Sequence, residues 1–330
     1  MAPVPLSVLD LVSVVQGSAP REALHRSLDL AQHVERLGFR RYWVAEHHNM
    51  IGIASAATSV VLGYLAQGTS SIRMGAGGIM LPNHSPLQIA EQFGTLESLH
   101  PGRIDLGLGR APGTDPVATR AMRRDPNAAD RFPEDVQELQ ALFAPARDGQ
   151  RIQAVPGAGL RVPLWILGSS LFGSQLAAFL GLPYAFASHF APAALDAALA
   201  TYRQKFEPSD QLERPYAMAG VNVVVADTDA EAKRLFSSIQ QAFCDLHRGT
   251  RGLLAPPIDD IDAYWSPAEK ATAESMLACS FVGSPETVRR GLDRFVERTE
   301  IDELIVATTL FDHEARKRSF SMLADLWERR

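Results

Sequence analysis

The sequence predicts an α/β protein folded as a (β/α)8 barrel, the TIM-barrel architecture. Short runs rich in β-branched and aromatic residues alternate with segments whose apolar residues recur at helical spacing. No Pro-, Gly- or Ser-rich linker and no shift in composition divides the 330 residues, so we expect a single domain over residues 1–330. A doubly wound open sheet is the alternative arrangement for the same alternation.

The composition is typical of a globular protein that handles small molecules. Hydrophobic residues make up 46% and charged residues 21% of the chain, so a sizeable core can be buried. The 32 Lys and Arg against 38 Asp and Glu give a formal charge of −6, which argues against a nucleic-acid-binding surface. Cys244 and Cys279 lack CxxC spacing, so neither a disulfide framework nor a zinc site is expected.

The chain carries no recognisable targeting segment. Its start lacks the cationic residues of a secretory signal. Residues 162–195 contain no charged residue, but several glycines and Pro183 interrupt them, so a spanning helix is not expected. These features predict a cytoplasmic protein.

Eight strands can be placed from the apolar pattern. They are expected at Val8–Val12, Tyr42–Ala45, Ile72–Leu81, Ile104–Leu108, Leu164–Leu167, Tyr184–Ala187, Val221–Ala226 and Glu303–Thr309. Three longer segments without clear periodicity interrupt the alternation, at Ala111–Asp130, Ala144–Val162 and Gly249–Ser266. In a barrel we expect such insertion loops over the carboxyl-terminal rim or at contacts between subunits.

Polar and glycine residues gather at the carboxyl ends of these strands, where barrel enzymes carry their reactive groups. They are Glu46-His47-His48-Asn49 at the second strand, Gly77-Gly78 and His84 at the third, Arg110 at the fourth, Gly168-Ser169-Ser170 at the fifth and Ser188-His189 at the sixth. Parallel strands would bring all of them to one rim, which therefore predicts the site.

The histidine pair after the second strand is a candidate for acid–base chemistry. Side chains alternate along a strand, so Glu46 and His48 can share one side while His47 points away. A neutral imidazole can act as a general base or donate a hydrogen bond near neutral pH, whereas the simpler interpretation is that one histidine orders the loop and the other fills space. No catalytic metal is expected, because the first strand lacks the His-x-His pair typical of metal-dependent barrel hydrolases.

Gly168-Ser169-Ser170 opens a helix directly after a strand, which predicts an anion site. Backbone amides at a helix start and serine hydroxyls bind anions, glycine admits a phosphate closely, and Arg110 would balance its charge. Ordinary N-capping by a serine and a surface ion pair for Arg110 are the alternatives. The run Gly75-Ala76-Gly77-Gly78 indicates a strand that a flat group approaches closely, or a strained backbone.

Five motifs follow one another along the chain. They are Ala45-Glu46-His47-His48-Asn49, Gly78-Ile79-Met80-Leu81-Pro82-Asn83-His84-Ser85-Pro86, Pro101-Gly102-Arg103-Ile104-Asp105-Leu106-Gly107-Leu108-Gly109-Arg110, Trp165-Ile166-Leu167-Gly168-Ser169-Ser170 and Phe281-Val282-Gly283-Ser284-Pro285. In this order and spacing they resemble the bacterial luciferase-like flavin monooxygenases over nearly the whole chain. The resemblance implies a barrel, usually a homodimer, that binds FMN at its carboxyl-terminal rim and uses reduced FMN and dioxygen on a small organic substrate.

The resemblance also implies roles for single residues. His47 matches the family's catalytic histidine, and His48 would order the catalytic loop beside it. Arg110 matches an arginine that meets the flavin phosphate, and Gly168-Ser169-Ser170 with Phe172-Gly173 matches the phosphate loop. Gly77-Gly78 falls where these proteins have a non-proline cis peptide under the flavin ring.

Two departures separate the chain from luciferase itself. Gly168 stands at an acidic position and Gly109 at the reactive-cysteine position, so aldehyde oxidation and light emission are not inherited, and the closer likeness is to luciferase-like oxidoreductases with a Gly-Ser-Ser loop. No second dinucleotide site can be recognised, so we expect a separate reductase to supply reduced FMN. A deazaflavin-dependent hydride-transfer enzyme and a flavin-binding protein without turnover are the alternatives.

Overall fold

The computed structural model describes residues 3–111, 115–125, 127–250 and 252–328 of the chain. One sheet of nine parallel strands forms its centre, and all of these except β8 (Ser280–Gly283) close into a ring. The ring strands are β1 (Leu6–Asp10), β2 (Arg41–Val44), β3 (Arg73–Met80), β4 (Ile104–Gly109), β5 (Leu164–Gly168), β6 (Tyr184–Phe186), β7 (Ala217–Val225) and β9 (Glu303–Ala307). Pairing of β6 with β7 and of β9 with both β7 and β1 completes the ring, so the predicted barrel is confirmed and the open sheet is excluded.

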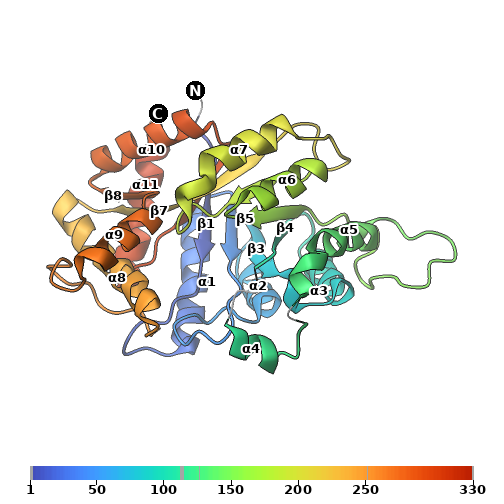
Figure 1. Cartoon of the computed structure of the whole chain (residues 1–330), viewed down its shortest axis with the longest axis horizontal. Coiled ribbons are helices and arrows are strands. Elements are labelled where there is room, and N and C mark those ends of the chain that lie inside the picture. Colours follow the sequence, from blue (N-terminus) through green and yellow to red (C-terminus); the bar gives the residue numbers. More distant parts are fainter. Residues whose placement is uncertain (1–2, 112–114, 126, 251, 329–330) are drawn as a thin grey trace.

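Helices surround the barrel on its outer side (Figure 1). The longer ones are α1 (Pro20–Arg36), α2 (Thr58–Gln67), α3 (Pro86–Leu99), α5 (Phe132–Phe143), α6 (Leu171–Phe179), α7 (Leu195–Gln204), α8 (Asp229–Arg248), α9 (Pro267–Met276), α10 (Pro285–Thr299) and α11 (His313–Glu328). Shorter pieces are α4 (Pro116–Ala121) and the 3-10 turns η1 (Leu81–Asn83), η2 (Ala128–Arg131) and η3 (Pro192–Ala194). Within the described residues, none of the helices has the length and apolar character needed to cross a bilayer.

The strand β8 was not placed from the sequence. It pairs in parallel with the carboxyl half of β7, from Asn222 to Val225, while the amino half of β7 pairs with β6. The strand predicted at Val221–Ala226 therefore covers only the half of β7 that lies beside β8. Its amino half, Ala217-Met218-Ala219-Gly220, has no β-branched or aromatic residue, so the strand pattern does not reveal it.

Aromatic side chains fill the inside of the barrel. The rings of Trp43 and Trp165 meet edge to face, with centroids 5.1 Å apart and an interplanar angle of 85°. A Cβ atom at Gly75 would lie 2.4 Å from Nε1 of Trp43, and one at Gly77 would lie 2.8 Å from Cδ1 of Leu9. Glycine in β3 is thus required by neighbouring side chains of the core, and a ligand is not needed to explain Gly75.

Two of the three predicted insertion segments reach the carboxyl-terminal rim. In Gly249–Ser266, Leu254 bridges to Val15 in the loop after β1. In Ala111–Asp130, of which residues 112–114 and 126 lie outside the described part, Asp115 accepts a 3.0 Å hydrogen bond from Asn49 after β2. For these two segments the expected position is confirmed.

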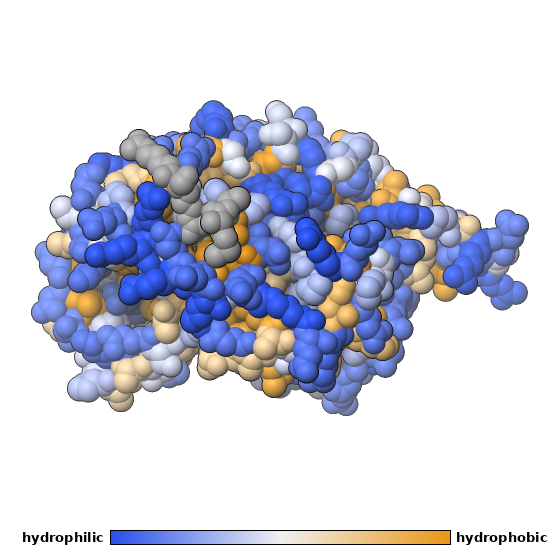
Figure 2. Space-filling model, turned by 90° about the horizontal axis from the view of Figure 1, so that it is seen from above, coloured by the Kyte–Doolittle hydropathy of each residue, from blue (hydrophilic) through white to orange (hydrophobic). Residues whose placement is uncertain are grey.

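The segment Ala144–Val162 does not reach the rim, so of the two expected positions only a contact between subunits stays a prediction for it. It leads into the amino end of β5 and projects sideways from the molecule (Figure 1). Figure 2 shows that its projecting tip is hydrophilic. The reason is topological, because a segment that precedes a barrel strand enters at the amino end, opposite the carboxyl-terminal rim.

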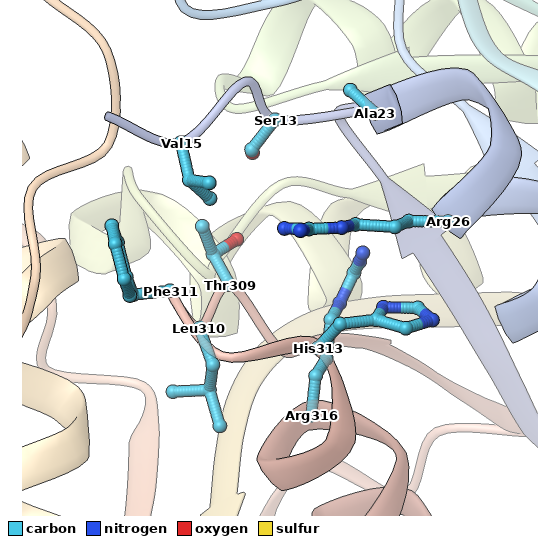
Figure 3. A pocket seen from close by; sticks show the side chains of 9 residues that line it. All are labelled: Ser13, Val15, Ala23, Arg26, Thr309, Leu310, Phe311, His313 and Arg316. Carbon is cyan, nitrogen blue, oxygen red and sulfur yellow. The ribbon is translucent and has the colours of Figure 1, made fainter. Parts of the chain in front are cut away.

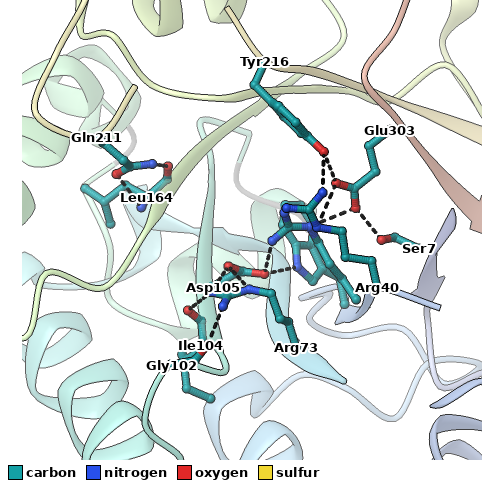
Figure 4. Close-up of polar contacts among 12 residues, drawn as sticks. Ser7, Arg40, Arg73, Gly102, Ile104, Asp105, Leu164, Gln211, Tyr216 and Glu303 are labelled. Carbon is teal, nitrogen blue, oxygen red and sulfur yellow. Dashed lines mark hydrogen bonds and ion pairs between the residues drawn. The ribbon is translucent and has the colours of Figure 1, made fainter. Parts of the chain in front are cut away.

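Buried charges close the amino end of the barrel. Arg41, the first residue of β2, donates to Glu303 at 2.8 Å and to Asp105 at 2.7 Å, and all three side chains are buried. Both carboxylates accept further hydrogen bonds (Figure 4). Ser7 and Tyr216 donate to Glu303, and Arg73 and Trp43 donate to Asp105. Because hydrogen bonds surround these charges, their loss of hydration is compensated, and β1, β2, β4 and β9 are tied together at their amino ends.

Replacing Arg41 by Met should lower the free energy of unfolding by about 3–5 kcal/mol, because two buried carboxylates lose their shared cation. Urea denaturation followed by circular dichroism measures this loss. Arg40→Met is the matched control, since the Arg40 side chain is 45% exposed and lies 3.9 Å from Glu303, and we expect a loss below about 1 kcal/mol. Equal losses in the two variants would contradict a central role for Arg41.

Candidate active site

The predicted site residues share the carboxyl-terminal rim of the barrel. His47 and His48 follow β2, Gly77-Gly78 lies within β3, Arg110 directly follows β4, and residues 168–173 join the end of β5 to the first turn of α6. Because all barrel strands are parallel, these residues lie at the same end of the molecule.

A buried carboxylate, Glu46, links the ends of β2 and β3. Its Oε1 accepts hydrogen bonds from Nε2 of His48 at 2.7 Å and Nε2 of His84 at 2.8 Å, and its Oε2 accepts one from the backbone N–H of Met80 at 3.0 Å. Burial alone would raise the pKa of Glu46, but the bonds from the two imidazoles and Met80 hold it below its usual value. Glu46 therefore stays ionised at neutral pH and fixes the loop that carries His47.

The structure brings Glu46 and His48 together and adds His84 as a second partner, but β2 ends at Val44, so the loop conformation and not strand alternation produces this contact. The ligand atoms of Glu46, His48 and His84 lie within 4.8 Å of one another, a spacing that could hold a metal ion. Each imidazole here donates through a protonated Nε2, so the arrangement is a hydrogen-bonded group complete in itself. The catalytic role of His48 stays a prediction, and its observed contact is with the buried carboxylate.

Arg110 and the start of α6 form a candidate anion site. The guanidinium carbon of Arg110 lies 4.1 Å from the centroid of the Phe172 ring, and the described residues offer Arg110 no acidic partner. Ser170 occupies the N-cap position of α6, yet its hydroxyl does not bond to the first-turn amides. Neither alternative interpretation, a surface ion pair or ordinary serine capping, is found in the described part of the chain. A cation thus lies beside uncapped helix amides and exposed serine hydroxyls, the donor set that a phosphate group requires.

Glycines shape the same corner of the rim. A Cβ atom at Gly168 would lie 3.5 Å from Cα of Gly173, so the end of β5 and the first turn of α6 are in close contact. The peptide between Gly77 and Gly78 is cis, as the resemblance implies. A Cβ atom at Gly78 would lie 2.8 Å from the carbonyl oxygen of Gly107, so packing against β4 already requires glycine there. A flavin ring over this peptide stays a prediction.

A small cavity lies between the loops after β1 and β9 (Figure 3). Its volume is about 20 Å³, which holds roughly one water molecule and no flavin. Its cations already have partners, since Arg316 pairs with Asp10 at 2.9 Å and His313 with Asp29 at 2.8 Å. This cavity is therefore too small to be the site of a flavin.

Fold and rim together define a (β/α)8-barrel protein with a histidine-rich mouth and a candidate anion site after its fifth strand. The family model described as luciferase-like monooxygenase matches residues 6–303, and the chain belongs to this family. It is 53% identical over 323 residues to a luciferase-like monooxygenase of Escherichia coli (strain K12), covering 98% of this chain and 96% of the relative. It is 52% identical over 326 residues to the protein YvbT of Bacillus subtilis (strain 168), covering 98% and 97%.

Solved structures show the same fold. Apo-MsnO8 is 35% identical to this chain with a TM-score of 0.91, and 98% of each chain is covered. Two more distant structures share only the fold. They are the oxygenating constituent of 3,6-diketocamphane monooxygenase of Pseudomonas putida in complex with FMN (18% identical, TM-score 0.73, 98% and 97% covered) and an F420-dependent secondary alcohol dehydrogenase with an F420-acetone adduct (16%, TM-score 0.72, 99% of each). The expected family is thus confirmed, whereas a Gly-Ser-Ser subgroup stays a prediction.

Replacing Glu46 by Gln should lower the free energy of unfolding at pH 7 by about 1–3 kcal/mol, because an amide cannot accept all three hydrogen bonds. The lowered pKa of Glu46 means that its contribution is present above the ordinary value of 4.5 and is lost as the pH falls through the folded value. The difference between wild type and variant should therefore shrink below pH 4.5, as urea denaturation at pH 7 and pH 3.5 can measure. Glu297→Gln, on the exposed face of α10, is the control. A difference that persists unchanged at pH 3.5 would contradict this account.

Proposed function

We propose that this chain is an FMN-dependent monooxygenase that uses reduced FMN and dioxygen on a small organic substrate. The observation that carries the proposal is Arg110, which has no acidic partner among the described residues and lies over Phe172 at the start of α6, where the serine hydroxyl does not cap the helix; together they fit the phosphate of FMN. Membership of the luciferase-like monooxygenase family supports the reaction class. Deazaflavin-dependent hydride transfer is the second candidate, because a neighbour of the same fold is F420-dependent.

The residues that would hold FMN are Arg110, Ser169, Ser170 and the backbone from Gly168 to Gly173. Arg110 and the first-turn amides of α6 would neutralise the phosphate, and Phe172 holds the guanidinium in place by stacking. FMN, once bound and reduced, supplies the reaction with dioxygen that no protein side chain provides.

The histidines would act on the oxygen side of the reaction. His47 follows β2 at the mouth and would donate a hydrogen bond or a proton to the reacting oxygen. Glu46 holds His48 at 2.7 Å, which limits the freedom of the loop that carries His47. The Trp43 and Trp165 rings fill the barrel beneath and exclude water from below.

We also propose a homodimer in the cytoplasm that receives reduced FMN from a separate reductase. Exposed apolar side chains one turn apart on α2, Val60 (71% exposed) and Tyr64 (38% exposed), offer a surface for a second copy. Analytical ultracentrifugation tests the assembly.

Titration of the purified chain with FMN, reduced FMN and F420 tests the cofactor. We expect flavin binding to be tighter than F420 binding, and Arg110→Ala to raise the FMN dissociation constant about 10- to 100-fold, because a charge-assisted contact is lost. Arg151→Ala, in the projecting segment, is the control and should leave FMN binding unchanged. An unaltered FMN dissociation constant in Arg110→Ala would remove Arg110 from the site, and preference for F420 would favour the second candidate.

Replacing His47 by Ala should leave the FMN dissociation constant within about twofold of wild type and slow the reaction of bound reduced FMN with dioxygen at least about tenfold, because a positioned proton donor is lost. Stopped-flow absorbance after mixing the reduced complex with oxygenated buffer measures this rate. Unchanged kinetics with normal FMN binding would contradict the role of His47.

A further inference from the structure

A second histidine of the mouth, His189, is held firmly to β7. Its backbone carbonyl accepts a 2.6 Å hydrogen bond from Nδ2 of Asn222. The preceding residue, Ser188, donates its hydroxyl proton to the carbonyl oxygen of Gly220 at 2.6 Å. Two consecutive residues after β6 are thus fixed to two positions of the neighbouring strand, and the backbone that carries the imidazole cannot swing away from the rim.

One edge of the His189 ring is sealed against the barrel wall. Nδ1 has no contact with solvent and no hydrogen-bond partner among the described residues. A Cβ atom at position 220 would lie 2.5 Å from Nδ1 and 3.3 Å from Cε1, so this edge packs directly on Gly220. The ring of Phe190 packs edge to face at 4.9 Å.

This packing determines where the proton of the imidazole lies. A proton on Nδ1 would be a buried donor without an acceptor, which costs free energy, so the proton belongs on Nε2. Burial, with a smaller contribution from the charge that His47 can carry, lowers the pKa of His189 to about 4. The ring therefore remains an uncharged Nε2–H donor through the physiological range.

His189 and His47 come from opposite sides of the barrel. In the closed ring, β3, β4 and β5 separate β2 from β6 on one side, and β1, β9 and β7 separate them on the other. The two imidazoles are nevertheless close enough for the charge of one to act on the other. The two histidines thus belong to one mouth, and the sealed edge of His189 packs on Gly220 of β7.

We propose that His189 is a substrate-binding residue whose Nε2–H donates a hydrogen bond to a carbonyl or hydroxyl oxygen of a neutral substrate, opposite His47. The proposal rests on the proposed function, because it assumes that the chain is an enzyme with a substrate. The protonation state of the His189 ring, however, can be measured without any cofactor. The proposal assigns the mouth to ketones, aldehydes and alcohols rather than to cationic compounds, because an uncharged donor selects for an acceptor oxygen.

The first test is histidine nitrogen NMR on the full chain without flavin. The signals that disappear in His189→Gln belong to His189. We expect a protonated Nε2, an unprotonated Nδ1 and no titration between pH 8 and pH 5.5. A proton on Nδ1, or titration within that range, would overturn the proposal whether or not the chain binds FMN.

The second test uses cyclohexanone as a neutral carbonyl probe and cyclohexane as its apolar counterpart, both with the FMN-loaded chain. We expect cyclohexanone to bind more tightly than cyclohexane to wild type, and its dissociation constant to rise about 3- to 10-fold in His189→Leu. His189→Gln, which keeps an N–H donor, should bind cyclohexanone nearly as wild type does.

His100→Leu is the matched control, because His100 lies at the end of α3 and leads toward the amino end of β4, away from the mouth. FMN affinity should be the same in all four proteins. Equal cyclohexanone binding by wild type and His189→Leu at normal FMN affinity would overturn the role of His189. A wild-type chain that fails to bind FMN would overturn the proposed function instead, and the NMR result would then decide the state of His189.

Discussion

The buried guanidinium of Arg41 between two carboxylates determines which end of the barrel is available for chemistry. It joins β2 to β4 and β9 at their amino ends through contacts of 2.7 and 2.8 Å. Above this ionic layer the Trp43 and Trp165 rings occupy the barrel axis, and Arg41 itself lies 4.7 Å from the Trp165 ring. The interior is therefore packed from the base upward, and polar side chains can gather only at the opposite rim.

The two ends of the barrel satisfy buried carboxylates in different ways. At the base, arginines surround Asp105 and Glu303, and a guanidinium keeps its charge at every accessible pH. At the rim, imidazoles and a backbone amide surround Glu46. Imidazole is the side chain most often used for proton transfer in proteins, so the donors at the rim differ in chemical kind from the guanidinium groups at the base. This contrast separates the stabilising end of the molecule from the end at which proton transfer is possible.

The sequence predicts much of this architecture because the barrel alternation is repeated along the whole chain. The eight ring strands, the shared rim and the proximity of Arg110 to the start of α6 all follow from where strands end. The irregular residues of Ala144–Val162 do not themselves indicate in which direction the segment points. Only its position before β5 shows that it leads to the amino end of that strand, away from the rim. β8 was not predicted because its four residues are too few to show the apolar pattern by which the other strands were placed.

The finer contacts of the site lie beyond sequence reasoning. The bond between Glu46 and His84 joins residues 38 positions apart, and it depends on how β2 and β3 end in space. One edge of the His189 ring packs on Gly220, which leaves room for it because glycine has no side chain. The sequence does not show that these two residues are neighbours, so it does not predict this contact. Pairwise contacts of this kind follow from packing, and a local pattern contains no record of them.

The close contacts of β3 and β4 also constrain how this barrel can diversify. At Gly75, Gly78 and Gly107 the first atom of any side chain would come within 2.2–2.8 Å of the Trp43 ring or of backbone atoms. These three positions are closed to variation for mechanical reasons, even in a descendant with a new cofactor or substrate. Evolution, or a mutant library aimed at new selectivity, has its freedom instead in the loops that reach over the rim, such as the one that contains Asp115.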